Sequence, residues 1–115
     1  MADDPISFRV NVRIFHGEHP FLGKGRIQLL ERIEQFGSIA QAAKSMEMSY
    51  RKAWGLIKEM NAIAREPLVE KQSGGKSGGG AIVTNAGKAT IRKYQQLMQS
   101  LEAHLTKLTE DTHWI

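Results

Sequence analysis

The sequence predicts a mostly α-helical domain with a small β-sheet, and three observations lead to this fold class. Two short amphipathic segments follow one another between residues 38 and 64. Two apolar runs, residues 67–69 and 81–83, flank the glycine-rich stretch 74–80. An apolar stripe with helical spacing then continues toward the C-terminus. A helix pair followed by a strand, a loop and a strand is the order of a winged helix-turn-helix, here with a long C-terminal dimerisation helix.

The composition fits one domain with an anionic partner. The chain has 115 residues, 41% of them apolar, no cysteine and a formal net charge of +4. Residues 38–80 hold seven Lys/Arg against four Glu, so most of the excess positive charge falls in this segment. The absence of cysteine excludes disulfides and thiolate metal sites. We expect a cytoplasmic protein, because no apolar run is long enough for a membrane span and the start does not read as a signal peptide.

The N-terminal part of the chain predicts one strand and one helix. Residues 7–15 alternate between apolar and polar side chains, which is typical of a half-buried strand. A loop is expected over residues 16–25, because it contains three glycines and a proline. A helix over 26–36 follows, ended by Gly37 as a C-cap glycine. Its apolar positions, which we expect to be buried, are Ile27, Leu30, Ile33 and Phe36.

Two serines define the helix-turn-helix. Ser38 can cap a helix that ends near Met46, and Ser49 can cap a second helix over residues 50–64. Glu47 lies in the turn between them, at a position where a left-handed backbone and hence glycine are common. We therefore expect either mild backbone strain at Glu47 or a slightly different turn.

The C-terminal part predicts a ribbon and a long helix. The ribbon strands are expected at 68–72 and 81–84, and a helix of about 25 residues starts at Thr84, with Gly87 packed closely on the domain. We divide the chain into a DNA-binding domain (1–84) and a dimerisation helix (85–115) that form one compact unit. Helix packing on its own domain is the alternative, but the apolar stripe is too long for it, so we favour a dimer seam. The seam consists of Ile91, Tyr94, Met98, Leu101, Leu105 and Leu108.

Three separated motifs, in order, resemble a known family. They are Ser49-Tyr50-x-x-Ala53-Trp54-x-x-Ile57-x-Glu59-Met60-Asn61, then Gly74-Gly75-Lys76-x-Gly78-Gly79-Gly80-Ala81, then Val83-Thr84-x-x-Gly87. Together they resemble the N-terminal, LysR-like winged helix of ModE-type molybdenum-responsive regulators. The resemblance implies a homodimeric transcription regulator, with repression the expected sign, that binds a palindromic operator. The printed sequence stops soon after the long helix, so we expect no molybdate-binding module and do not carry molybdate sensing over.

The first turn of the second helix is the expected reading element. Arginine can bind guanine O6 and N7 with two hydrogen bonds, and a helix N-terminus presents N–H groups to phosphate. Trp54 is expected on the flank of the core, with a groove-facing side chain as the alternative. Glycines around Lys76 allow the loop to approach DNA closely. The residues expected to contact double-stranded DNA are Ser38, Gln41, Ser49, Tyr50, Arg51, Lys52, Gly55, Lys58, Lys71, Lys76 and Ser77.

No pattern indicates an enzyme, a cofactor or a metal site. Gly75-Lys76-Ser77 lacks the upstream glycine and the following helix of a P-loop. His16 and His19 have too few potential co-ligands nearby, and we interpret them as loop residues. Two alternatives to specific DNA binding stay open: a protein-interaction module, and an architectural protein with little sequence preference. A separate sensor protein as a further partner is also left open.

Overall fold

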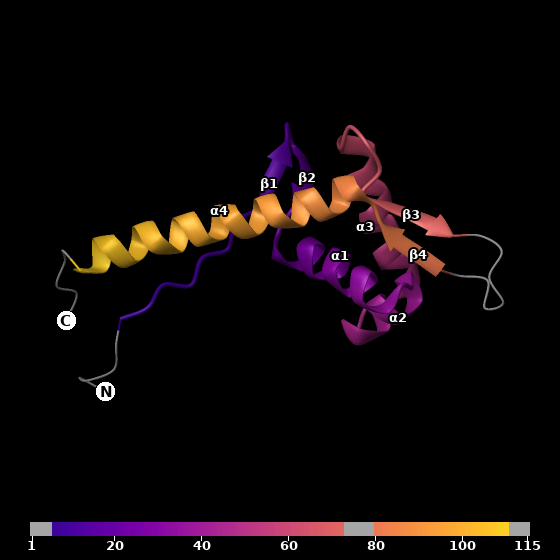
Figure 1. Cartoon of the computed structure of the whole chain (residues 1–115), viewed down its shortest axis with the longest axis horizontal. Coiled ribbons are helices and arrows are strands. Elements are labelled where there is room, and N and C mark those ends of the chain that lie inside the picture. The colour runs from indigo at the N-terminus through magenta and orange to yellow at the C-terminus, as the bar shows by residue number, and fades with distance from the viewer. Residues whose placement is uncertain (1–5, 73–79, 111–115) are drawn as a thin grey trace.

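A computed structural model of the protein describes residues 6–72 and 80–110. It is elongated, with extents of 59 × 31 × 23 Å, because one helix projects far beyond a compact helical unit (Figure 1). The predicted fold class is confirmed. In chain order the elements are β1 (Ile14–His16), β2 (His19–Leu22), α1 (Lys24–Phe36), α2 (Ile39–Ser45), α3 (Tyr50–Ile63), β3 (Val69–Gln72), β4 (Gly80–Val83) and α4 (Asn85–Glu110).

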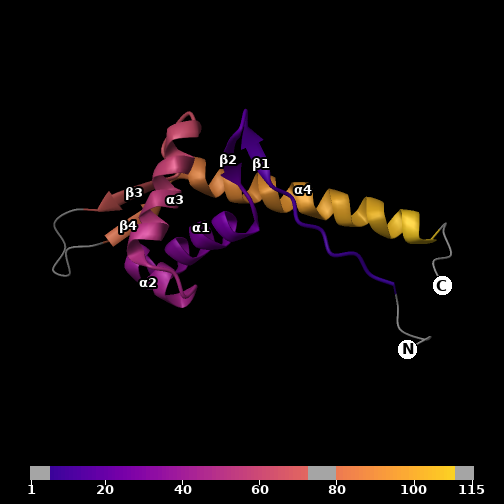
Figure 2. The same ribbon diagram turned by 180° about the vertical axis from the view of Figure 1, so that it is seen from behind.

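The N-terminal segment departs from the prediction. The strand expected over residues 7–15 is present only as β1, which pairs antiparallel with β2 in the region expected to be a loop. Gly17 makes this hairpin possible, because its φ of 61° is left-handed and two residues suffice for the turn. Residues 6–13 are extended without a strand partner and run beside α4 in both views (Figures 1 and 2). The alternation therefore reflects packing on a helix, since Val10 and Val12 are half-buried while their neighbours are exposed.

The helix-turn-helix is built by the caps that the sequence predicts. The Ser38 hydroxyl accepts a hydrogen bond from the Gln41 N–H at 3.2 Å, and Ser49 accepts one from the Lys52 N–H at 3.0 Å. Gly37 is left-handed, with φ 65°, and Glu47 has φ 54° as expected for its turn position. These contacts fix where α2 and α3 begin.

Helix α1 lies at the centre of the core and contacts α2, α4 and β4. Its buried side chains include Leu29, which the sequence analysis missed, whereas Phe36 is 39% exposed and not buried as expected. Phe36 is the last residue of α1, and the chain turns directly after it at the left-handed Gly37, so few elements remain to cover its ring. The fully buried large side chains are Leu29, Leu30, Ile33, Ile39, Ile57, Met60 and Leu68.

Helix α4 has a buried root and a projecting end. Ile91 and Tyr94 are each 6% exposed and belong to the core of their own domain, and Met98 packs against that core. Leu101 and Leu105 are half-buried, and Leu108 is 45% exposed. A shallow hollow between Leu105, Thr109 and the extended residues Ile6 and Phe8 shows that the N-terminal segment lies along this projecting end. Within the described ranges, no helix combines the length and apolarity needed to cross a membrane.

Candidate nucleic-acid interface

One face of α3 points away from the core and carries three of the predicted contact residues. Ala53, Ile57 and Met60 bury the inner face, and Arg51 and Lys58 are exposed on the outer one. Gly55 lies between them at helical spacing, so residues 51, 55 and 58 form one outer stripe. A Cβ atom built on Gly55 would find no described atom within 4 Å apart from its chain neighbours and the nearby backbone of its own helix. This stripe is therefore basic at both ends and lacks a side chain in the middle, which lets a partner approach the helix backbone.

The flank of α3 that faces the wing (residues 69–83) is a cluster of aromatic and basic side chains. Lys71 Nζ lies 4.1 Å from the centre of the Trp54 ring and 5.5 Å from that of Tyr50, and Lys58 Nζ lies 6.0 Å from Trp54. Ammonium groups at these distances are attracted to the ring faces by about 0.5–1 kcal/mol when exposed. The contacts connect β3 to α3. They also explain why Trp54 is only partly buried: it is a core flank on one side and a platform for Lys71 on the other.

The base of the wing is attached to the start of α2. The strands β3 and β4 pair antiparallel, with Lys71 opposite Ala81 and Gln72 opposite Gly80. Gly80 forms an isolated β-bridge with Ser38, and the Ala81 N–H donates to the Gly37 carbonyl at 3.0 Å. Ser38 and the exposed Gln41 thus lie next to the wing base. Lys76 and Ser77, the two contacts predicted at the wing tip, lie outside the described residues.

Asn61 holds the end of α3 to β3, a role that the sequence analysis did not find. Its Oδ1 accepts a hydrogen bond from the buried Leu68 N–H at 2.7 Å, and its Nδ2 donates to the Val69 carbonyl at 3.1 Å. The Leu68 N–H and the Val69 carbonyl are thus bonded to the Asn61 side chain and not to the backbone of the neighbouring strand. The sequence signal for this role is weak: Asn61 is a polar residue four positions after the apolar Ile57, at the end of the motif that starts at Ser49.

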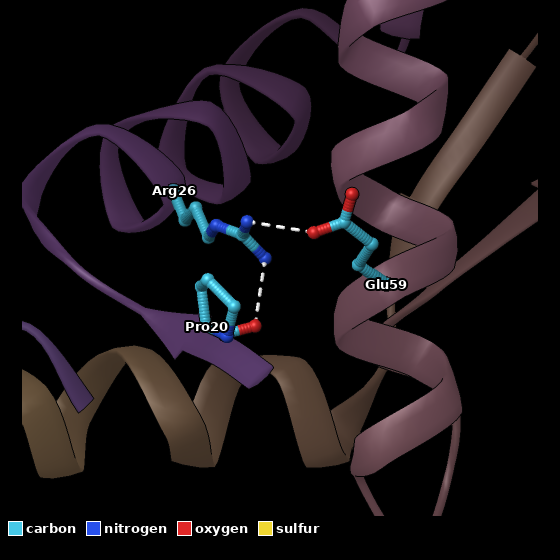
Figure 3. A network of polar contacts seen from close by, with 3 residues as sticks. All are labelled: Pro20, Arg26 and Glu59. Carbon is cyan, nitrogen blue, oxygen red and sulfur yellow. Dashed lines mark hydrogen bonds and ion pairs between the residues drawn. The ribbon is translucent and has the colours of Figure 1, made fainter. Parts of the chain in front are cut away.

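On the other flank of α3, an ion pair fixes this helix against α1. Arg26 Nη2 lies 2.8 Å from Glu59 Oε1, and Arg26 Nη1 donates to the Pro20 carbonyl at 3.2 Å, so the guanidinium joins β2, α1 and α3 (Figure 3). The Arg26 side chain is 15% exposed and that of Glu59 is 56% exposed. Lys52 lies on this same flank, away from Tyr50 and Lys71. The predicted contact residues therefore surround α3 instead of sharing one line.

The described part of the chain contains no group of three or more His, Asp or Glu side chains arranged for a metal ion. His16 and His19, expected in a loop, pair across the β1–β2 hairpin instead.

The chain is similar to regulators from several bacteria. It is 42% identical over 91 residues to the DNA-binding transcriptional dual regulator ModE of Escherichia coli, and 43% identical over 89 residues to the molybdenum transport protein ModE of Azotobacter vinelandii. It is 43% identical over 88 residues to the molybdenum-pterin-binding protein MopA of Rhodobacter capsulatus. These alignments cover 79%, 77% and 76% of the chain but only 35%, 33% and 32% of the relatives.

The chain thus spans about a third of the length of the curated relatives that it matches. No protein-family model matches it. The relatives called ModE in Escherichia coli, Shigella flexneri and Yersinia pestis are named as transcriptional regulators, a non-enzymatic class, which agrees with the absence of any enzymatic pattern in the sequence. The resemblance that the sequence motifs indicate is therefore confirmed: this chain is homologous to the N-terminal DNA-binding domain of ModE-type regulators.

Proposed function

We propose that the protein is a DNA-binding transcription regulator that inserts α3 into the major groove of its operator. The observation that carries the proposal is the outer face of α3, where Arg51 and Lys58 enclose the open position Gly55. Arg51 on the first turn is placed to read a guanine, and Lys58 to meet a phosphate. The wing, with its glycine-rich stretch 74–80, is proposed to contact the DNA backbone beside α3.

We further propose that two copies act together through the projecting half of α4. Leu101, Leu105 and Leu108 continue the apolar stripe beyond the core of the domain, and the stripe ends at the exposed Leu108. In this proposal residues 1–84 form the DNA-binding unit and residues 85–115 the dimerisation helix. Ile91 and Tyr94 support the root of that helix from within the core, and the seam with the partner begins after them. A two-fold dimer would read a palindrome with half-sites about 34 Å apart, and such a regulator works in the cytoplasm.

In vitro selection from randomised duplexes tests this function. The purified protein is mixed with a random duplex pool at about physiological salt, and the bound fraction is sequenced after several rounds. We expect enrichment of a palindrome whose half-sites are one helical turn, or a multiple of one turn, apart. Binding without enrichment, lost steeply as salt rises, would indicate an architectural protein. A strict monomer that binds no duplex would indicate a protein-interaction module and contradict the proposal.

Arg51→Ala then tests the reading role on the selected duplex. Loss of one bidentate contact should cost about 1–3 kcal/mol of binding and relax the preference at one base pair of each half-site. The measurement is a repeat of the selection with the variant, together with fluorescence anisotropy on the operator and on a scrambled duplex. The control is Arg92→Ala, which removes an exposed arginine from α4.

A further inference from the structure

A groove lined by basic side chains runs along the flank of α3 opposite Lys71. Its walls are the extended residues 9–13, the end of β2, the start of α1 and the first two turns of α3, and its volume is about 710 Å³. Among the described residues, no Asp or Glu lines this groove, whereas three other hollows on the described surface each include a glutamate. The charged side chains of this basic groove are Arg9, Arg13, Lys24, Arg26 and Lys52.

We propose that the basic groove binds the phosphodiester backbone of the operator, on the strand opposite the one that the wing meets. This inference rests on the proposed function, because it needs α3 to lie in the major groove. It adds contacts from residues outside both the helix-turn-helix and the wing, mainly Arg9 and Lys24, beside Lys52 of α3.

Among the residues that the structure describes, most of the positive charge of the basic groove has no acidic partner. Arg26 is held by Glu59 and the Pro20 carbonyl, and the Arg13 guanidinium lies 5.1 Å from the centre of the Phe15 ring. Among the described residues, no carboxylate lies within 4.0 Å of Arg9, Arg13, Lys24 or Lys52. These side chains are all exposed, and their mutual repulsion is an unfavourable term that a bound polyanion would reverse.

The start of α1 adds a second unfavourable arrangement in the same place. Its N-cap is Gly23, which offers no side-chain hydrogen bond, and its first turn has no acidic residue but contains Lys24 and Arg26. Positive side chains at the positive end of a helix dipole oppose folding. The same arrangement favours binding of an anion, because the uncapped N–H groups and the cations act on it together.

The geometry around α3 explains why DNA backbone is the ligand. Lys52 and Leu56, one turn apart, face the basic groove, while Tyr50 and Trp54 face Lys71 on the opposite flank. A helix in the major groove has one phosphate strand on each side. The wing base supplies a cation to one strand, and the basic groove supplies cations to the other. Leu56 and Met48 in its lining offer apolar contact to deoxyribose.

A small free anion fits the basic groove less well than a strand of DNA. A site for one oxyanion needs several donors that converge at a short distance and are shielded from water. Here the cations are on exposed side chains spread over residues from 9 to 52, and no buried polar or charged residue is found in the described part of the chain. Such an open array suits a chain of phosphates.

The test removes two charges of the basic groove without changing α3. Arg9→Gln with Lys24→Gln is compared with Arg92→Gln with Lys93→Gln, which removes one arginine and one lysine from exposed positions on α4. Binding of the selected operator and of a scrambled duplex is measured by anisotropy over a series of salt concentrations. The salt slope is the change in the logarithm of the binding constant with the logarithm of the salt concentration. We expect its magnitude to fall by about 2 per protomer in the groove variant. The groove variant should also bind both duplexes at least tenfold more weakly at about 0.1 M salt. The α4 variant should bind as the wild type does.

The outcomes separate this inference from the proposed function. Arg9→Lys with Lys24→Arg keeps the charge and should restore slope and affinity; failure to restore them would indicate a structural role and overturn the inference. If the wild type binds its operator and the groove variant keeps both slope and affinity, the groove inference is wrong while the function stands. If the wild type binds no duplex, both are wrong. Stabilisation by inorganic phosphate alone, lost in the groove variant while DNA binding is unchanged, would assign the groove to a free anion.

Discussion

Helices α3 and α4 each contain one glycine, and the two glycines have opposite surroundings. A Cβ on Gly87 of α4 would lie 2.6 Å from Val83 Cγ1 and closer still to the Leu68 carbonyl oxygen. A Cβ on Gly55 of α3 would meet nothing within 4 Å. Glycine in a helix costs about 1 kcal/mol relative to alanine. That cost is offset at Gly87 by close packing inside the domain, and nothing in the described part of the chain offsets it at Gly55.

The difference separates a surface that the protein itself covers from a surface that no other described element covers. At Gly87 the first turn of α4 packs so closely against Leu68 and Val83 that no side chain fits, so this glycine is needed for the fold. No described residue outside α3 covers its outer face at Gly55, which is why we propose that this glycine serves binding. The same division runs along α4, where Tyr94 is buried and Leu108, further along the same stripe, is exposed.

The largest effect is expected for Gly87→Ala. The added methyl would overlap the Leu68 carbonyl, which cannot retreat because it accepts a hydrogen bond from the Thr84 N–H at 3.0 Å. Overpacking against backbone should lower the free energy of unfolding by about 3 kcal/mol, even after the gain in helix propensity. Urea denaturation followed by circular dichroism measures it. Stability equal to the wild type would mean that Gly87 does not pack against Leu68 and Val83 as described.

The projecting half of α4 provides the next test of the division. Leu101→Asp with Leu105→Asp should leave the domain folded but produce a monomer, because charge on the seam opposes pairing. Operator affinity should fall about 100-fold, since a dimer gains at least this factor from bivalent binding. Sedimentation velocity and anisotropy measure the two effects. The control, Gln96→Asp with Ala103→Asp, places the same charge on other exposed positions, and equal behaviour of the two variants would argue against the seam.

Gly55→Ala tests the other glycine and, unlike Gly87→Ala, should raise the free energy of unfolding. The protein should become more stable by about 1 kcal/mol, because alanine favours the helix and meets no neighbour. Operator affinity should fall about tenfold, because the methyl group holds the DNA away from the α3 backbone. A thermal melt and an anisotropy titration of the same sample show both effects. Unchanged affinity would contradict close approach of DNA at this position.

The smallest effect is expected at the contact between α4 and the N-terminal segment. The Tyr94 hydroxyl donates to the Val12 carbonyl at 2.8 Å, and burial raises the pKa of Tyr94 above its ordinary value of 10.0. Tyr94→Phe should therefore cost about 1 kcal/mol at neutral pH. Because the pKa is higher in the folded state, this contribution is complete below pH 10 and is lost as the pH rises through the folded value. Urea denaturation at neutral and at alkaline pH should show the difference between variant and wild type narrowing; a constant difference would contradict this.

The helix-turn-helix could be predicted from the sequence because its determinants are local. Gly37, Ser38 and Ser49 act within a few residues of themselves, and apolar periodicity defines the inner faces of α2 and α3. The N-terminal strand was predicted wrongly for the opposite reason. An alternating segment shows which side chains face a neighbour, but not whether the neighbour is a strand or, as at Val12, a helix more than 80 residues away.

The candidate site divides in the same way. Arg51, Gly55 and Lys58 could be named from the sequence, because one helix carries them all. Three arrangements could not be predicted, because each joins elements that are distant in the chain. They are the contact of Lys71 with Trp54, the hydrogen bonds of Asn61 to the start of the ribbon, and the basic groove with Arg9, Lys24 and Lys52. The sequence by itself determined the helices, their caps and the composition of the stripes. Only the tertiary structure decided which part of each stripe is covered, because burial depends on contacts between elements that no local pattern encodes.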